Sequence, residues 1–461
     1  MLTYHIWVVG CQMNKADSQR LAGKLEALGL RPEDDVERSD VVVINSCAVR
    51  QSAEERVFSK LGVLKGLKKR RQQAIVALMG CMVGPALQVQ DLRRRFPHVD
   101  LFLRPLEDEP LLAAVRERVL QGQALACALP AEPAGGRLAR PRPVPAGEVG
   151  SPTRWVPIIY GCDRFCTYCI VPYRRGRERS RPLEEVIDEV HLFVSQGAVE
   201  VTLLGQIVDR YGFDLPGQPD LADLLQRLDP IDGLHRIRFL TSHPSDLTQK
   251  VIDAVASLPK VCEHINLPVQ SGDDEILRRM GRGYTVKQYR SLVERIRETI
   301  PSVSLATDVI VGFPGETQEQ FERTFELLSD LRFDVVHVAA YSPRPGTRAA
   351  RLADDVPAEV KRERLQLVET LQEQVAGGIN AALLGQTLEV LVEGKARGRW
   401  QGRTRTNKLV FFDDPEPEGT DAARWVGKLV EVDITRTSPW ALQGTVRVGR
   451  AVELSAGRLS A

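Results

Sequence analysis

The sequence predicts an α/β protein with three folded regions, namely a parallel sheet flanked by helices, a partial (βα)6 barrel and a small all-β barrel. Residues 1–120 and 155–378 alternate short apolar runs with helical patterns, which is typical of parallel sheets. From residue 387 onward, apolar and polar residues alternate as they do in half-buried strands. The chain has 461 residues, enough for about three domains of roughly 100–200 residues each.

In the N-terminal region, which we place at residues 1–125, each expected strand is followed by an expected helix. The strands are apolar and rich in β-branched residues, at residues 6–9, 41–44, 74–78 and 99–102. Helical patterns follow at residues 18–28, 53–68, 86–95 and 111–120. This order indicates a Rossmann-like parallel sheet, which binds ligands beyond the C-terminal ends of its strands.

Residues 126–150 are rich in Pro, Ala, Gly and Arg without periodicity, and we interpret them as a linker. The strand-and-helix rhythm then returns in a central domain, which we place at residues 151–380. Its expected strands lie at residues 155–160, 200–204, 236–240, 264–269, 305–311 and 335–341. Six such units predict a barrel open on one side, with ligands at the C-terminal strand ends. The all-β barrel should occupy residues 381–450, with strands near 387–393, 408–412, 428–435 and 444–448.

Composition excludes several classes of protein. Basic and acidic side chains nearly cancel, to a net charge of +1, so a role with nucleic acid must rest on local patches. No apolar run approaches the ~18 residues of a membrane span, and the first residues resemble a strand rather than a secretion signal. Eight cysteines are too sparse for a disulfide scaffold and suit the reducing cytoplasm, where we expect this protein.

Three cysteines on one short segment carry the strongest chemical signal in the chain. Cys162, Cys166 and Cys169 have the spacing C-x3-C-x2-C. Three thiolates can bind three irons of a 4Fe-4S cluster and leave the fourth iron open to a substrate, while Phe165 and Tyr168 shield the cluster. The alternatives are buried structural thiols or a zinc site, although zinc favours paired C-x2-C spacings.

Three further cysteines each follow an expected N-terminal strand. Cys11 follows residues 6–9, Cys47 follows residues 41–44, and Cys81 follows residues 74–78. Because parallel strands end in one crevice, these thiolates are expected to converge and to hold a second cluster with an open iron. Single cysteines at buried strand ends are commonly small apolar residues, which is the alternative for these three and our interpretation of Cys262.

Polar or glycine-containing loops end three of the central strands. They contain Gln206, Gln270, and the segment from Gly312 to Glu316. Glycines let backbone approach a ligand closely, and polar side chains at a barrel mouth can bind the polar ends of a cofactor. An ordinary strand-to-helix turn explains each loop equally well.

Two basic segments are candidates for binding anions. Residues 174–181 contain five arginines and directly follow the cysteine segment, where they could pair with a carboxylate or with phosphates. In the tail, basic side chains surround an aromatic one, a combination that suits single-stranded RNA. This set is Lys395, Arg397, Arg399, Trp400, Arg403, Arg405 and Lys408. A solvated charged loop and an exposed charged hairpin are the respective alternatives.

Together these motifs resemble the methylthiotransferase family of radical SAM enzymes over essentially the whole chain. The C-x3-C-x2-C segment resembles the signature of radical SAM barrels, and the C-terminal barrel is similar to a TRAM domain. The sequences GCQMN at residues 10–14, NSCAVR at 45–50 and GCM at 80–82 are similar to the branch that modifies isopentenylated adenosine in tRNA. The ribosomal-protein and threonylcarbamoyladenosine branches usually have other residues after the first cysteine.

The resemblance implies insertion of a methylthio group at carbon 2 of N(6)-isopentenyladenosine next to the anticodon. Cys162, Cys166 and Cys169 would hold the cluster that cleaves S-adenosylmethionine, and the other three cysteines would hold an auxiliary 4Fe-4S cluster that carries sulfur. The implied partners are a tRNA anticodon stem-loop, a reductant such as flavodoxin or ferredoxin, and a sulfur source, with no membrane. We expect a monomer.

The sequence departs from the family pattern at three positions. Ile207 and Asp209 stand where the family commonly has asparagines, and Leu240 stands where threonine is usual. These departures put fine contacts near the substrate in question. Two alternatives therefore stay open, namely a methylthiotransferase for threonylcarbamoyladenosine or a ribosomal-protein aspartate, and a non-catalytic iron–sulfur RNA-binding sensor.

Overall fold

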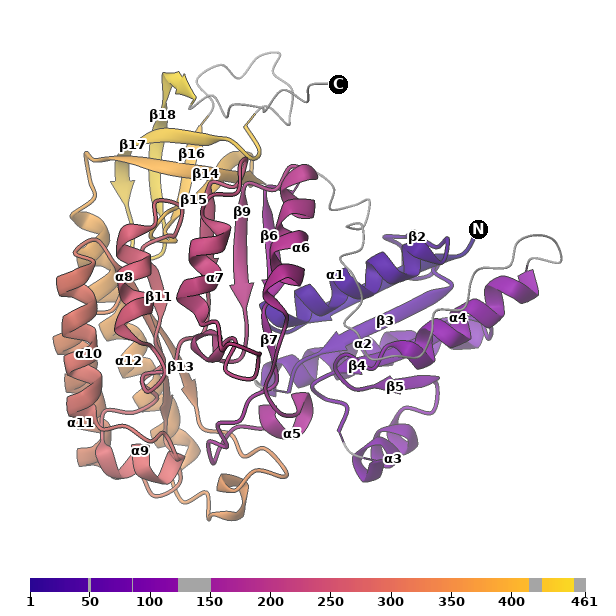
Figure 1. Cartoon of the computed structure of the whole chain (residues 1–461). Coiled ribbons are helices and arrows are strands. Elements are labelled where there is room, and N and C mark those ends of the chain that lie inside the picture. Colours follow the sequence, from indigo (N-terminus) through magenta and orange to yellow (C-terminus); the bar gives the residue numbers. More distant parts are fainter. Residues whose placement is uncertain (49–50, 85, 123–150, 414–424, 452–461) are drawn as a thin grey trace. The chain divides into compact units, whose positions relative to one another are not determined.

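The structure is a computed structural model, and it describes residues 1–48, 51–84, 86–122, 151–413 and 425–451. Arg50 and the linker expected at residues 126–150 lie outside these ranges. The chain divides into two compact units. Of the described residues, the first contains 1–48, 51–84, 86–122, 160–164 and 169–181, and the second contains 151–159, 165–168, 182–413 and 425–451. Figure 1 draws the chain and labels most of its helices and strands.

The first unit is built on a five-stranded parallel sheet, as the sequence predicts. Its strands follow the order β2-β1-β3-β4-β5. Their bounds are β1 Thr3–Val9, β2 Arg31–Pro32, β3 Val41–Ser46, β4 Ile75–Gly80 and β5 Leu101–Leu103. Only β2 was not expected, because its two residues carry a proline and lie at the edge of the sheet.

Helices cover both faces of this sheet. Their bounds are α1 Gln12–Ala27, α2 Gln51–Arg70, α3 Ala86–Arg95 and α4 Glu109–Gly122. Alternate residues of β3 enter different cores: Val42 packs in the cluster that contains Leu61 of α2, whereas Val43 packs with Leu21 of α1. Burial on both faces explains why β3 is a continuous apolar run rather than an alternating one.

The second unit contains the six parallel strands predicted for the partial barrel. They form two three-stranded sheets, β10-β9-β6 and β11-β12-β13, and a parallel bridge from Ile237 to Val261 leads from one sheet toward the other. The bounds are β6 Thr153–Pro157, β9 Glu200–Leu204, β10 Arg236–Phe239, β11 His264–Asn266, β12 Ser304–Val311 and β13 Val335–Ala340. Figure 1 shows these strands with helices along their outer side.

The helices of the barrel begin at strong N-caps. Thr285 and Thr317 each form a capping box with a glutamine three residues later, which fixes where α10 and α11 start. The longer helices are α6 Leu183–Ser195, α7 Leu221–Leu228, α8 Gln249–Ser257, α10 Val286–Thr299, α11 Gln318–Leu331 and α12 Ala358–Ala381. Shorter elements are β7 Ile159–Tyr160, α5 Val171–Arg175, β8 Arg179–Ser180 and α9 Asp274–Met280.

The C-terminal part of the second unit is the predicted all-β barrel, closed in the order β14-β15-β16-β18-β17. Its strands are β14 Thr387–Ala396, β15 Arg399–Thr404, β16 Leu409–Asp413, β17 Leu429–Thr437 and β18 Leu442–Ala451. β15 was not among the strands predicted for this barrel, and it is a barrel strand with alternate residues buried. Trp400 of β15 fills the core, where 1% of its surface is exposed.

No helix in the described part of the chain is long and apolar enough to cross a membrane.

Candidate metal centres

The C-x3-C-x2-C segment forms the loop between β7 and α5. Gly161 precedes the first cysteine at φ 74°, and a Cβ there would lie 2.0 Å from the carbonyl oxygen of Arg177. Only glycine therefore fits this turn, and it allows the Cys162 amide to donate to the Gly176 carbonyl over 3.1 Å. In the second unit, Thr167 donates from its amide to the Met280 carbonyl over 2.9 Å, which anchors the middle of the loop.

Cys166 has a buried cation beside it. Arg282 Nη1 donates to the Cys166 sulfur over 3.5 Å, and its other nitrogens donate to Tyr284 Oη and to the Pro268 carbonyl. Burial opposes the charge of Arg282, but Tyr168, Tyr284 and Cys166 together raise its pKa well above the ordinary value. A charged donor to one sulfur is the kind of contact that tunes an iron–sulfur cluster.

In the first unit, Cys11, Cys47 and Cys81 lie just beyond the C-terminal ends of β1, β3 and β4, which are adjacent strands (Figure 1). Cys11 is also the N-cap residue of α1. A Cβ on Gly10 would lie 2.8 Å from the Cβ of Cys47, and the Cys81 amide donates to the Ser46 carbonyl over 2.9 Å. The three segments therefore meet at one edge of the sheet.

A buried network of amides and hydroxyls holds this edge together. Asn14 Nδ2 donates to Asn45 Oδ1 over 2.8 Å and to the Ser46 carbonyl over 2.9 Å. Asn45 Nδ2 donates to Ser18 Oγ over 2.9 Å, and the Cys11 thiol donates to Asn14 Oδ1 over 3.1 Å. Asn14 and Asn45 belong to the cysteine motifs of the sequence, but the sequence analysis assigned them no role. Their position within three residues of a cysteine was the signal that could have identified them.

Two buried arginines of α5 also belong to this site. Arg175 Nη2 pairs with Asp17 Oδ2 over 2.9 Å, and Arg174 is likewise buried. Burial raises the pKa of the Cys81 thiol, and the neighbouring Arg175 charge opposes that shift. The expectation that residues 174–181 face a carboxylate or phosphates therefore fails for Arg175, because Asp17 and the cysteines already engage it.

The candidate ligands at both places are cysteine thiols, the usual ligands of iron–sulfur clusters. The seven cysteines in the described part of the chain are all free thiols. Within the same residues, no three His, Cys, Asp or Glu side chains stand close enough to share one metal ion. In a 4Fe-4S cluster each thiolate binds a different iron, so its ligands stand further apart than the four ligands of a structural zinc ion.

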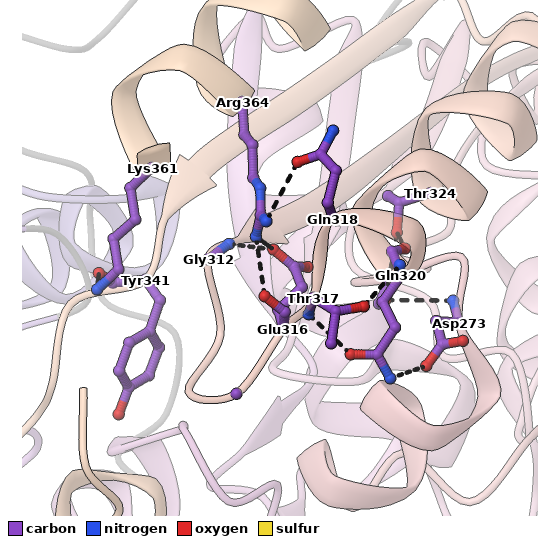
Figure 2. Close-up of polar contacts among 12 residues, drawn as sticks. Asp273, Gly312, Glu316, Thr317, Gln318, Gln320, Thr324, Tyr341, Lys361 and Arg364 are labelled. Atoms are coloured by element: carbon purple, nitrogen blue, oxygen red, sulfur yellow. Dashed lines mark hydrogen bonds and ion pairs between the residues drawn. The ribbon is translucent and has the colours of Figure 1, made fainter. Parts of the chain in front are cut away.

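At the end of β12, Gly312 and Glu316 form a closed turn, shown in Figure 2. Glu316 Oε2 accepts from the Gly312 amide over 2.6 Å and from Arg364 Nη1 over 2.7 Å. Gly312 has φ 68°, and a Cβ there would meet the Lys361 side chain at 2.4 Å. Glu316 is therefore buried support for the Gly312 backbone rather than an exposed polar group at the mouth.

The two glutamines take different places. Gln270 is nearly buried with φ 70°, its amide donates to the Asp308 carbonyl over 2.8 Å, and its own carbonyl accepts from Ile310. Gln206 follows β9 and is half-buried. Beyond it, Asp209 accepts from the His243 amide over 2.7 Å and from Ser242 Oγ over 3.1 Å. Burial raises the pKa of Asp209 to about 7.

The basic residues of the tail divide into two groups. Arg405 pairs with Glu263 and Lys408 pairs with Asp334, each over 2.7 Å, so both are occupied by partners in the (βα) barrel. Arg403 lies 3.6 Å from Glu393 and donates to the Asn407 carbonyl. The stacking role expected of Trp400 is contradicted by its burial in the core.

The second group lies on the β14–β15 hairpin. Lys395 and Arg397 are exposed, Lys395 Nζ lies 4.2 Å from the centroid of the Trp400 ring, and Arg399 pairs with Asp413 over 2.9 Å. Sequence reasoning missed Trp440, which is 60% exposed in the turn between β17 and β18. Trp440 stands between Pro439 and Ala441 and does not belong to the apolar–polar alternation of either strand, which is the signal that could have identified it as a turn residue.

Three family profiles match successive parts of the chain. Residues 3–104 match the uncharacterized protein family UPF0004, residues 156–328 match the radical SAM superfamily, and residues 381–446 match the TRAM domain. The radical SAM match indicates S-adenosylmethionine and an iron–sulfur cluster as cofactors, and the TRAM match indicates RNA binding.

Solved structures agree with this fold. The radical S-adenosylmethionine methyltransferase TsrM from Kitasatospora setae, solved with cobalamin and a 4Fe-4S cluster, aligns with a TM-score of 0.54 at 17% identity. The alignment covers 76% of this chain and 74% of TsrM. The cobalamin-dependent radical enzyme OxsB aligns with a TM-score of 0.52 at 13% identity, covering 80% of this chain and 56% of OxsB.

Curated relatives match along nearly the whole chain. A tRNA-2-methylthio-N(6)-dimethylallyladenosine synthase of Roseiflexus sp. (strain RS-1) is 50% identical, over 96% of this chain and 89% of the relative. The protein of the same name from Herpetosiphon aurantiacus is 47% identical, over 98% of this chain and 99% of the relative. The chain therefore belongs to the radical SAM methylthiotransferase family, in the branch of the tRNA-2-methylthio-N(6)-dimethylallyladenosine synthases.

Proposed function

We propose that this protein inserts a methylthio group at carbon 2 of N(6)-isopentenyladenosine next to the anticodon of tRNA. The observation that carries the proposal is the presence of two separate sets of three free thiols. One set lies on the loop before α5, and the other lies at the ends of three adjacent strands. One set is enough to hold the cluster that makes a radical. The second set can hold the cluster that supplies sulfur to carbon 2.

Each set of thiols has the ligand chemistry of a 4Fe-4S cluster with one open iron. Cys162, Cys166 and Cys169 would hold the first cluster, and Cys11, Cys47 and Cys81 would hold the second. When bound, the first supplies the electron that cleaves S-adenosylmethionine to a 5′-deoxyadenosyl radical, and the second supplies the sulfur. The electron would come from an external reductant such as flavodoxin or ferredoxin, the sulfur from a separate source, and the methyl group from a second S-adenosylmethionine. The 5′-deoxyadenosyl radical would take the hydrogen atom from carbon 2.

The chain's own residues position these groups. Arg282 donates to the Cys166 sulfur, and the anchor of Thr167 on the Met280 carbonyl keeps the loop in place. Glu316 and Arg364 fix the turn at Gly312, whose backbone lies at the C-terminal end of β12. Binding sites of such barrels lie at this end, so we assign the turn to the S-adenosylmethionine site.

The C-terminal barrel supports an RNA substrate, and we assign its contact to the β14–β15 hairpin. Lys395 and Arg397 are exposed there, and Arg399 lies beside them in an ion pair with Asp413 of the same barrel. Basic side chains of this kind contact phosphates and orient the RNA without reading its sequence. The choice of isopentenylated adenosine rests on the printed names of the relatives.

Two matched triple variants test the proposal. Replacing Cys11, Cys47 and Cys81 by alanine should leave about four of the eight irons in two 4Fe-4S clusters. That variant should still release 5′-deoxyadenosine but make no methylthio product. Replacing Cys162, Cys166 and Cys169 should leave the other four irons and abolish both reactions. Full methylthiolation by the first variant would overturn the second-cluster assignment.

A further inference from the structure

Arg175 and Asp17 form a buried ion pair at the edge of the sheet that carries Cys11, Cys47 and Cys81. Asp17 lies on α1, six residues after Cys11, and Arg175 lies at the end of α5, six residues after Cys169. The side chains are 2% and 3% exposed, and Arg175 Nη2 lies 2.9 Å from Asp17 Oδ2. A buried pair is costly to dehydrate, so its place next to the thiols calls for a reason beyond stability.

Arg175 and the preceding Arg174 also act on the cysteines. The charge of the Arg175 guanidinium interacts electrostatically with Cys81 and with Cys11. Arg174 is 6% exposed and interacts electrostatically with Cys81. Two guanidinium groups therefore share the neighbourhood of a single thiol.

Two polar atoms of these buried side chains have no hydrogen-bond partner among the residues that the structure describes. In the described part of the chain, Arg174 Nε and Asp17 Oδ1 are buried and have no hydrogen-bond partner. A buried donor or acceptor without a partner costs about 1–3 kcal/mol, and native proteins keep few of them. An unpartnered guanidinium nitrogen among thiols indicates that an anion completes the site.

We propose that Arg174 and Arg175 are positioning residues that balance the negative charge of the auxiliary cluster and its sulfur cargo. The inference rests on the proposed second cluster. Three thiolates and a sulfur anion would concentrate negative charge next to Cys47 and Cys81, which are buried, and a nearby cation acts strongly there. Asp17 fixes Arg175 in position, and α5 connects both arginines to the loop that carries Cys169.

The potential of the auxiliary cluster reports this charge directly. Reduction adds an electron, so a nearby cation stabilises the reduced form and an anion destabilises it. Arg175→Gln and Arg174→Gln should therefore lower the potential, whereas Asp17→Asn should raise it. Arg175→Lys keeps the charge and should restore most of the potential.

The measurement uses the full chain with Cys162, Cys166 and Cys169 replaced by alanine, so that only the auxiliary cluster gives a signal. Electron paramagnetic resonance at controlled potentials measures the ratio of reduced to oxidised cluster. At a given potential this ratio should be at least tenfold lower in Arg175→Gln, which corresponds to a fall of about 59 mV in the reduction potential. The matched control is Arg177→Gln, two residues further on, whose exposed side chain pairs with Asp163. The potential of the auxiliary cluster should not change in this control.

The outcomes separate this inference from the proposed function. Failure of the parent triple variant to take up iron and sulfide would overturn the second cluster, and the inference with it. Normal iron content with the same potential in Arg175→Gln, Arg174→Gln and Arg177→Gln would overturn the inference alone. If Arg175→Gln loses iron, its potential cannot be compared, and Asp17→Asn becomes the test. An Asp17→Asn variant whose potential does not rise would count against the charge-balancing role.

Discussion

Arg282 donates a hydrogen bond from Nη1 to the sulfur of Cys166 over 3.5 Å, and nearly all of its surface is buried. The remaining nitrogens are held by Tyr284 Oη and the Pro268 carbonyl, so the guanidinium cannot easily turn away. This contact places a fixed positive charge on one thiol of the C-x3-C-x2-C loop. It makes Arg282 the counterpart, in the second unit, of Arg175 in the first.

Arg282→Gln removes this charge and should slow the release of 5′-deoxyadenosine from S-adenosylmethionine. Loss of an outer-shell partner of a metal ligand typically costs about 10- to 100-fold in affinity or activity. The rate is measured under dithionite after normalising to iron content. Arg278→Gln, in which the exposed pair with Glu275 is lost, is the control and should match the unmodified protein. An unchanged rate in Arg282→Gln would show that the charge has no influence on cleavage.

Gly312→Ala should weaken the binding of S-adenosylmethionine by about tenfold or more. Alanine is strained by roughly 1–2 kcal/mol at φ 68°, and its Cβ would displace Lys361 from the turn that Glu316 supports. Equilibrium dialysis of cluster-loaded protein measures the affinity. Gly197→Ala introduces similar strain at φ 94° with open space around it, before β9. If both variants bind S-adenosylmethionine as tightly as the parent, the turn is not part of the site.

Asp209→Asn should stabilise the protein at pH 8 but not at pH 4. Burial raises the pKa of Asp209 from 3.8 to about 7. The folded protein then keeps a proton that the unfolded chain loses, so stability falls as the pH rises from about 4 to 7. Asparagine can accept from the His243 amide without ionising. Urea unfolding at both pH values checks the difference, and an equal effect at pH 4 and pH 8 would refute the raised pKa.

Arg238→Met should destabilise the second unit, because it leaves Glu200 buried and unpaired. Arg238 Nε lies 2.9 Å from Glu200 Oε2, with both side chains 5% exposed, and the other nitrogens donate to the carbonyls of Thr404 and Arg405. Breaking such a pair costs roughly 3–5 kcal/mol in the free energy of unfolding. Arg227→Met removes an exposed pair with Glu184 and should cost roughly 1 kcal/mol or less. Similar losses in the two variants would contradict this account.

Local patterns predicted most of the fold. Apolar strands of the parallel sheets such as β3 and β9 were visible because they are buried on both faces, and their β-branched runs differ from the helical stretches between them. The strands that escaped prediction lack this signal. β2 has two residues, and β15 places Arg399 and Arg403 on its outer face around Trp400, so it resembled an exposed hairpin.

The spacing of residues along the chain predicted the cysteines of the candidate site but not its other members. Cysteines three or four residues apart, or at successive strand ends, could be identified from the chain alone. The partners of the charged residues could not, because Arg175 and Asp17 are separated by 158 positions and Arg405 and Glu263 by 142. Both arginines were candidates for binding external anions, and the fold gives each a carboxylate partner far away in the sequence.

Nucleoside analysis of tRNA tests the central claim most directly. Reconstituted protein is incubated with a reductant, S-adenosylmethionine and tRNA that carries either N(6)-isopentenyladenosine or N(6)-threonylcarbamoyladenosine next to the anticodon. We predict that mass spectrometry shows a methylthio group on the isopentenylated nucleoside alone, and that Cys11→Ala abolishes it. A methylthio group on threonylcarbamoyladenosine instead, or none on either nucleoside while 5′-deoxyadenosine is released, would contradict the proposed function.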